Sequence, residues 1–387
     1  MSALEVLNGF DNSHFLEDET GRREFLKFCG RMAVLLGLAE SAIPQVEAAL
    51  QEAAQRRPSV IWLEFQDCAG NSESFLRADG PSAGQALLEA VSLDYHETIM
   101  AAAGERAEEA RQKALEENSG EIIVVVEGSI PTADNGVYCT VAGKTAQQIL
   151  EEIEPHAAAF VAVGTCASFG GLPMARPNPT GAVALERVVD KPVINLPGCP
   201  ANPDVIMGLL VHNLVFGRLP ELDRQKRPLF AYGKRIHDTC ERRPHYDAGQ
   251  FALHFDDYGA RQGFCLYKLG CKGPETYNVC ASMRWNQNAS WPVKAGHPCI
   301  GCSEEAFWDR FTPFYERLPN VAGFGVEQSA DDIGKVLVGV TAAGLAAHGI
   351  YAWAVRRSDR RTAERTAAEQ AAREKAIREA EGEGGEE

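Results

Sequence analysis

The sequence predicts an α/β fold with a doubly wound parallel sheet, followed by a loop-rich domain and a C-terminal transmembrane helix. Three observations predict it. Continuously apolar runs alternate with helical stretches up to about residue 225, six of the 11 cysteines fall between residues 226 and 330, and residues 336–355 carry no formal charge. The expected divisions are a leader region 1–50, a sheet domain 51–225, a cysteine-rich domain 226–330, a membrane helix 333–356 and a charged tail 357–387.

The apolar runs of the sheet domain end in turn signals. Helical stretches, such as 86–103 and 146–152, separate them. Short, continuously apolar strands alternating with helices are typical of a parallel sheet that is covered on both faces. The predicted strands are residues 59–65, 121–127, 159–163 and 192–196.

One cysteine follows each of three predicted strands: Cys68, Cys166 and Cys199. In parallel sheets the ligand site lies just beyond the carboxyl ends of the strands, so three cysteines distant in sequence are expected to converge there. We interpret them as ligands of one metal cluster; the alternative is three independent buried cysteines. Cys139 lacks this placement and is expected to pack as a small apolar residue.

The region from residue 235 onward is dense with metal-binding side chains and shows little hydrophobic periodicity, so cofactors are expected to organise it. An odd cysteine count in a chain of 387 residues does not indicate a disulfide scaffold. Iron–sulfur ligation is the first hypothesis and structural zinc is the alternative, although no zinc-finger unit repeats. The candidate ligands are His237, Cys240, Cys265, Cys271, Cys280, Cys299 and Cys302.

Arg22 and Arg23 precede a short apolar stretch, residues 32–39. This pattern is typical of a bacterial twin-arginine export signal, which carries proteins already folded around their cofactors. Cleavage is expected near residues 46–48, and Cys29 lies within the segment. The alternative is an ordinary amphipathic helix with a chance arginine pair.

The uncharged residues 336–355 are long enough to span a bilayer. Tyr351 and Trp353 stand at one end as interfacial aromatics, and Arg356, Arg357, Arg360 and Arg361 place that end in the cytoplasm. The body of the chain is therefore expected on the periplasmic, outer face of the inner membrane. The alternative is an Ala-rich core helix. A formal charge of −16 argues against a nucleic-acid partner.

Six further segments occur in a characteristic order. They are EGSIP (127–131), GTCA (164–167), NLPGCPANP (195–203), IHDTC (236–240), CLYKLGCKGP (265–274) and GHPCIGCSE (296–304). In these segments, and over almost its whole length, the chain resembles the small subunit of nickel–iron hydrogenases. The resemblance implies a flavodoxin-like sheet domain and three iron–sulfur clusters in a line.

Matched residue by residue, the resemblance implies three ligand sets. The proximal 4Fe–4S set, nearest the nickel–iron centre, contains Cys68, Cys166 and Cys199. The medial set is Cys280, Cys299 and Cys302. Pro292 stands where a fourth cysteine would be, which implies a 3Fe–4S cluster. The distal 4Fe–4S set, nearest the surface, is His237, Cys240, Cys265 and Cys271.

The chain departs from the family pattern at Asn71, which stands where a fourth proximal cysteine is usual. We expect Asn71 as the fourth ligand. The alternatives are Asp67 or Ser72, a three-iron or water-ligated cluster, or no ligand role for Asn71. No additional cysteine stands beside Asn71 or at Gly171, where oxygen-tolerant relatives with a six-cysteine proximal cluster have theirs. That cluster is therefore excluded. A neutral amide in place of a thiolate is expected to raise the proximal potential.

The resemblance implies an electron-transfer subunit whose partner is a large subunit holding the nickel–iron centre. A membrane cytochrome b or quinone-linked subunit is the expected acceptor, and a higher oligomer of heterodimers is expected. One alternative is a cluster subunit of another respiratory complex, although such relatives lack the block from His237 to Cys302. Another is a membrane-tethered multi-cluster carrier without a hydrogenase partner.

Overall fold

The computed structural model describes residues 19–78, 91–286, 288–323 and 326–382. The chain divides into two compact units, one ending at Leu318 and one beginning at Pro319. The first unit is built on a five-stranded sheet with the order β2-β1-β3-β7-β9. All four strand pairs are parallel. The strands are β1 (Ser59–Glu64), β2 (Ser92–His96), β3 (Ile122–Glu127), β7 (Ala157–Val163) and β9 (Val193–Leu196).

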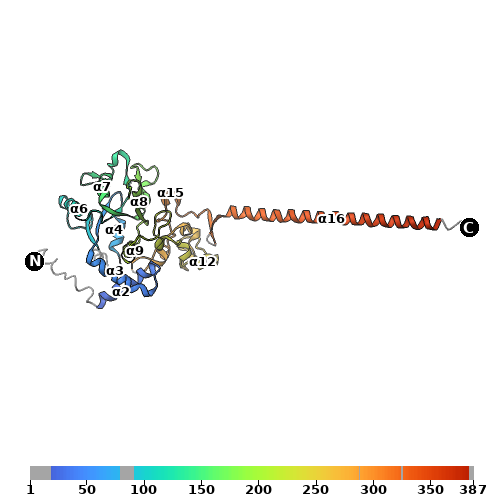
Figure 1. Cartoon of the computed structure of the whole chain (residues 1–387), viewed down its shortest axis with the longest axis horizontal. Helices are drawn as coiled ribbons and strands as arrows, with labels where there is room; N and C mark the ends of the chain where they lie inside the picture. The colour runs from blue at the N-terminus through green and yellow to red at the C-terminus, as the bar shows by residue number, and fades with distance from the viewer. Residues whose placement is uncertain (1–18, 79–90, 287, 324–325, 383–387) are drawn as a thin grey trace. The chain divides into compact units, whose positions relative to one another are not determined.

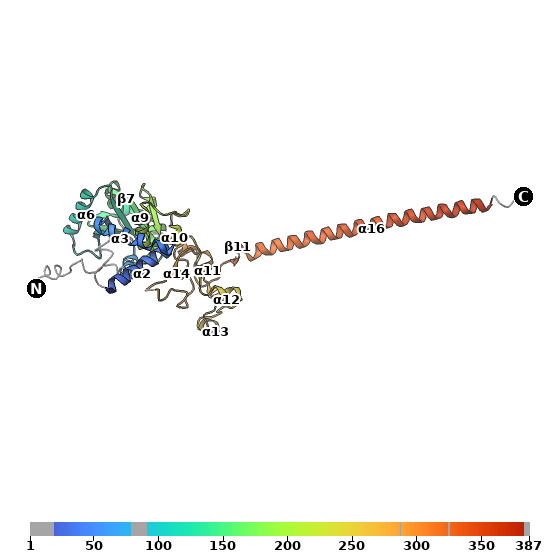
Figure 2. The ribbon, with the colours of Figure 1, turned by 60° about the horizontal axis from the view of Figure 1, so that its bottom comes forward.

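Helices cover both faces of this sheet, so its strands are apolar on both sides as the sequence predicts. On one face, α2 (Glu19–Leu35), α3 (Ile43–Arg56) and α9 (Pro203–Phe216) pack together (Figures 1 and 2). Their core includes Val60, Val161 and Val205. On the other face lie α6 (Glu105–Glu117), α7 (Ala146–Ile153) and α8 (Gly164–Phe169), around Val124 and Phe160.

The predicted helix over residues 86–103 is wrong for its second half. Residues 92–96 form strand β2, which pairs with β1; residues 79–90 lie outside the described part of the chain. Buried Tyr95 and His96 end this strand, while Ser92 and Asp94 hydrogen-bond near its start. Pairing at the sheet edge has outweighed the helical propensity of the flanking alanines.

Residues 19–50 of the expected leader region form structure in the first unit. Met32 of α2 and Val46 of α3 are completely buried in the core beside α9, as is Cys29. Arg31 of α2 also forms an ion pair with Asp204 at the start of α9, at 2.7 Å. The described residues of the leader region therefore pack against α9.

The cysteine-rich part of the first unit consists of loops and single helical turns, as the sequence predicts. The turns are α10 (Leu229–Tyr232), α11 (Ile236–Thr239), α12 (Arg243–Asp247), α13 (Tyr258–Arg261), α14 (Cys280–Met283) and α15 (Phe307–Arg310). Shorter elements elsewhere in this unit include α4 (Gly70–Leu76) and the ribbons β4 (Ile130–Pro131) with β8 (Ala182–Val183) and β5 (Thr140–Val141) with β6 (Lys144–Thr145).

The second unit contains an antiparallel pair, β10 (Asn320–Gly323) and β11 (Val326–Ser329), and the long helix α16 (Ala330–Gly382). Part of α16 is long and apolar enough to cross a membrane, with a mean hydropathy of 1.5 over its best window and none of that window buried. By its length and composition, this helix could anchor the chain to a membrane. The helix continues into the predicted tail as far as Gly382, because Ala, Glu and Arg are strong helix formers.

Candidate iron–sulfur sites

The three proximal cysteines lie at one edge of the sheet. Cys68 follows β1, Cys166 lies in α8 directly after β7, and Cys199 follows β9. Burial, together with the charges of the neighbouring Cys199 and Cys68 thiolates, raises the pKa of Cys166 to about 12. Cys199 is exposed on the chain by itself, yet partial burial of its sulfur and the charge of Cys68 raise its pKa in the same direction. The structure therefore brings these three sulfurs together.

The Asn71 side chain beside this set is buried and has hydrogen-bond partners at both ends of its carboxamide. Its Nδ2 donates to Glu127 Oε1 at 3.0 Å, and its Oδ1 accepts from the Ala201 backbone N–H at 2.8 Å. Ser72 and Asp67, the two alternative ligands, also face carboxylates. The Ser72 hydroxyl lies 2.7 Å from Glu127 Oε2 and 3.0 Å from Glu64 Oε1.

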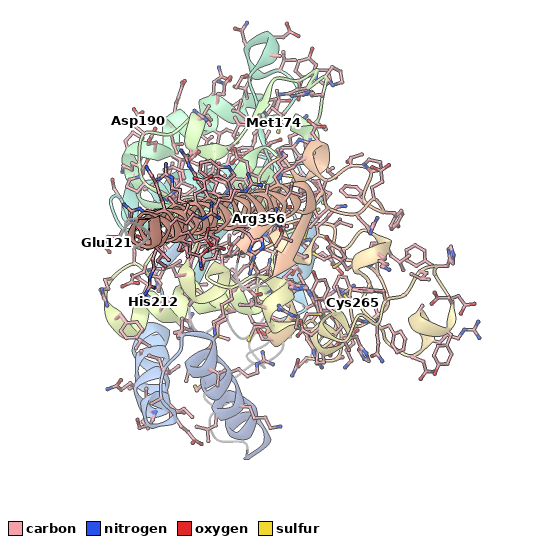
Figure 3. The ribbon with its side chains drawn as sticks, turned by 90° about the vertical axis from the view of Figure 1, so that its right-hand side faces the viewer. Glu121, Met174, Asp190, His212, Cys265 and Arg356 are labelled. Atoms are coloured by element: carbon pink, nitrogen blue, oxygen red, sulfur yellow. The ribbon has the colours of Figure 1, made fainter. Side chains whose placement is uncertain are left out.

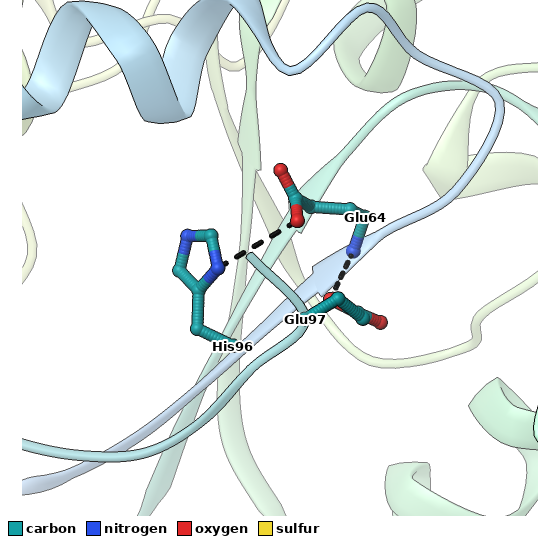
Figure 4. A group of neighbouring side chains, drawn as sticks. All are labelled: Glu64, His96 and Glu97. Carbon is teal, nitrogen blue, oxygen red and sulfur yellow. Dashed lines mark hydrogen bonds and ion pairs between the residues drawn. The ribbon is translucent and has the colours of Figure 1, made fainter. Parts of the chain in front are cut away.

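A group of buried and half-buried acidic side chains lies near Cys68, and sequence reasoning missed it. Glu97 Oε2 accepts from the Glu64 backbone N–H at 3.0 Å, and His96 Nδ1 lies 3.6 Å from Glu64 Oε2 (Figure 4). Burial raises the pKa of Asp67 to about 7 and that of Glu97 to about 8, with neighbouring carboxylates adding to both shifts. Burial lowers the pKa of His96 to about 4. The sequence did contain a signal for this group, because an acidic residue, Glu64 or Glu127, ends each of two apolar strands.

The four expected distal ligands come from α11 and the loops that follow it, where Figure 3 labels Cys265. Burial raises the pKa of Cys265 to about 12, and the Cys271 and Cys240 thiolates add to this shift. A Cβ built on Gly273 would lie 3.4 Å from Cys271 Sγ and 3.6 Å from the His237 backbone nitrogen. The His237 backbone thus lies close to the Cys271 thiol.

The His237 ring fits a metal ligand. Its Nε2 is buried and has no hydrogen-bond partner among the described residues. Burial lowers the pKa of His237 to about 4, so the imidazole is neutral and offers a free lone pair at physiological pH. A buried ring nitrogen without a partner costs free energy of folding unless a metal ion or a hydrogen-bond donor binds its lone pair.

The medial cysteines also converge. Burial raises the pKa of Cys280 and Cys299, and the Cys302 thiolate raises both further. Burial raises the pKa of Cys302 itself to about 11. Pro292, at the position of a fourth ligand, is exposed between buried Trp291 and Val293.

The three sets follow one another through the molecule. A backbone group of Cys199 faces the Cys302 sulfur, so the proximal and medial sets are neighbours. The Lys272 backbone N–H donates to the Cys299 carbonyl at 2.7 Å, and the Cys271 thiolate raises the pKa of Cys299. The medial set therefore lies next to the distal set as well.

The chemistry of these donors fits iron–sulfur clusters. Buried thiols with raised pKa values do not ionise by themselves, whereas a bound metal stabilises the thiolate form outright. Nine cysteines fall into the three sets. The other two pack as apolar residues: Cys29 is completely buried in α2, and Cys139 packs against the core beside α7.

The sheet and its three neighbouring thiol sets define an iron–sulfur, electron-carrying protein. Family models support this class. The C-terminal part of the NiFe/NiFeSe hydrogenase small subunit matches residues 232–315, and the 20 kDa subunit of NADH ubiquinone oxidoreductase matches residues 68–213. The chain belongs to the family of nickel–iron hydrogenase small subunits, because relatives of that family are similar to it over most of its length.

Among these relatives, the uptake hydrogenase small subunit of Azotobacter vinelandii is 48% identical over 323 residues, which are 83% of this chain and 89% of that protein. The quinone-reactive Ni/Fe-hydrogenase small chain of Wolinella succinogenes is 47% identical over 83% of this chain and 92% of that protein. A crystal structure of a reduced, active Ni-Fe-Se hydrogenase from Desulfomicrobium baculatum matches with a TM-score of 0.64 and 38% identity, over 68% of this chain and 100% of that one.

Proposed function

We propose that the chain carries electrons, one at a time, from dihydrogen oxidised at the nickel–iron centre of a large subunit to an acceptor in the membrane. The observation that carries this proposal is the convergence of nine cysteines and His237 into three neighbouring sets in a hydrogenase small subunit. The match at residues 232–315 argues against a subunit of another respiratory complex, which lacks this block.

The proposed clusters are a proximal 4Fe–4S cluster at Cys68, Cys166 and Cys199, a medial 3Fe–4S cluster at Cys280, Cys299 and Cys302, and a distal 4Fe–4S cluster at His237, Cys240, Cys265 and Cys271. Such clusters supply reversible one-electron steps. Cys68 and Cys199 are exposed on the chain by itself, which suits electron entry from a partner at the proximal site.

The protein tunes these steps through charge and hydrogen bonds. The backbone N–H of Arg242 points to Cys240 Sγ at 3.4 Å, and a hydrogen bond to sulfur favours the reduced cluster. The buried Lys272 ammonium interacts electrostatically with Cys271 and Cys299. Its positive charge between the distal and medial sets favours the arrival of an electron there.

The proposal extends to architecture and location. If the five strands of the sheet are numbered along the chain, their order is 2-1-3-4-5, which supports a flavodoxin-like domain. Arg22 and Arg23 support twin-arginine export to the periplasmic face of the inner membrane, and α16 supports a single anchor. A cytochrome b or quinone-linked subunit is the proposed acceptor, as the name of the Wolinella succinogenes relative suggests. The heterodimers are proposed to assemble into a higher oligomer.

Co-purification tests the proposal. The full chain, tagged and expressed in its own host, is expected to bring down a nickel-containing large subunit from solubilised membranes. A chain that purifies with its iron but without a nickel-containing partner would show that it serves another electron-transfer system.

A further inference from the structure

Asn71 contacts all three loops that carry the proximal cysteines. It lies three residues after Cys68, and its Oδ1 accepts from the N–H of Ala201, two residues after Cys199. A Cβ built on Gly164, two residues before Cys166, would lie 2.3 Å from Asn71 Nδ2 and 2.6 Å from Oδ1. The carboxamide therefore packs directly against the Gly164 backbone.

Glu127 fixes the orientation of this carboxamide. Glu127 is completely buried and accepts from the backbone N–H groups of Asn71 at 2.7 Å and Ser72 at 2.9 Å. The opposite orientation would place Oδ1 against the Glu127 carboxylate and the NH2 group against the Ala201 N–H, and both contacts would be repulsive. Only one of the two amide orientations satisfies both partners.

This geometry commits the polar atoms of Asn71 to protein partners. An iron bond at Nδ2 would break the hydrogen bond to Glu127. Oδ1 already accepts a hydrogen bond from the Ala201 N–H and packs against the Gly164 backbone. To bind iron, this oxygen would have to move away from Gly164. The hydrogen bonds of Asn71 instead connect the Cys68 loop to the Cys199 loop, and its carboxamide packs against the Cys166 loop.

We propose that Asn71 is a positioning residue that holds the three proximal cysteine loops together and does not bind iron. The proximal cluster is then held by three thiolates, and its fourth corner either carries a solvent-derived ligand or lacks iron. This inference rests on the proposed function, because it presupposes a cluster at this site.

Spectroscopy of the wild-type complex tests the inference directly. Electron-nuclear double resonance after exchange into D2O is expected to show an exchangeable deuteron coupled to a four-iron proximal cluster. Alternatively, spin counting in the oxidised complex is expected to show a second three-iron signal beside that of the medial cluster. In Asn71→Cys, which supplies a fourth thiolate, whichever of these two features the wild-type complex shows is expected to be lost.

A positioning role has its own readout. Asn71→Ala is expected to broaden the proximal electron paramagnetic resonance (EPR) signal and to shift its potential, because the loops lose their connection. Asn195→Ala is the matched control, since Asn195 is also buried and its Nδ2 donates to the Gln225 carbonyl at 2.8 Å. It is expected to leave the proximal signal unchanged.

The inference is overturned by a four-iron proximal cluster without an exchangeable coupling, or by a structure of the complex in which Asn71 lies within bonding distance of an iron. A complex whose proximal site contains no iron at all would instead contradict the proposed proximal cluster itself. The two failures are therefore distinguishable by iron content at this site.

Discussion

Replacement of Arg227 is predicted to destabilise the medial site. Arg227 is 4% exposed, and its Nε donates to Asp223 Oδ2 at 2.7 Å. Its Nη1 donates to Glu304 Oε1 at 3.1 Å and to the Ser303 carbonyl at 3.2 Å. Glu304 is also buried and follows the medial ligand Cys302 by two residues. Arg227→Met would therefore leave the Glu304 carboxylate buried without its cation.

Removal of one partner from a buried ion pair costs about 3–5 kcal/mol, since the remaining charge stays desolvated. Asp223 is more exposed than Glu304, so water can hydrate its carboxylate once Arg227 is replaced. Asp223 therefore adds little to the loss of folding free energy. At about 2–4 °C per kcal/mol for a large domain, the melting temperature is expected to fall by about 6–20 °C.

The assay is thermal melting of the co-purified complex, followed by calorimetry and by the medial EPR signal. Arg77→Met is the matched control, because Arg77 forms an exposed pair with Glu73. Such pairs contribute about 0–1 kcal/mol, so the control is expected to melt within about 4 °C of wild type. If Arg227→Met melts as the control does and keeps its medial signal, the buried pair does not support this site.

Three further predictions concern other parts of the chain. Gly171→Ala is expected to empty the proximal site, because φ at Gly171 is +61° and the new Cβ would lie 2.4 Å from Cys166 Sγ; wild-type iron content would contradict this. The pKa of Glu97 is raised from 4.5 to about 8 in the folded state, so the folded protein binds this proton more tightly than the unfolded chain does. The resulting contribution to the free energy of unfolding is full at low pH and is lost as pH rises toward 8. The melting temperature of Glu97→Gln, compared with that of wild type, is therefore expected to rise as pH increases from about 5 to about 8. The same difference from wild type at both pH values would contradict the raised pKa. A chain ending at Ser329 is expected to give a complex that reduces soluble dyes with dihydrogen but leaves the membrane; retention in the membrane would show another anchor.

The parts of the fold that could be predicted from sequence are those with a local signal. Strand β3 reads Ile-Ile-Val-Val-Val, and its apolar run and turn were sufficient to place it. Strand β2 reads Ser-Leu-Asp-Tyr-His and becomes a strand only through pairing with β1. No local pattern separates such an edge strand from the alanine-rich sequence that follows it.

The proximal site shows the same limit. Strand ends placed Cys68, Cys166 and Cys199 at one edge, because the geometry of parallel sheets is general. The partners of Asn71 come from β3 and from the loop after β9, which are distant in sequence. A single sequence identifies the missing thiolate at residue 71 but contains no signal for these tertiary hydrogen bonds.

The most direct test of the proposed electron-carrying role is EPR of the purified complex under dihydrogen, compared with the same complex reduced by dithionite. We predict that dihydrogen alone reduces the clusters of all three sets. A Cys299→Ser variant is expected to stop reduction beyond the proximal cluster. If dithionite reduces the clusters but dihydrogen reduces none of them, the chain does not carry electrons away from dihydrogen.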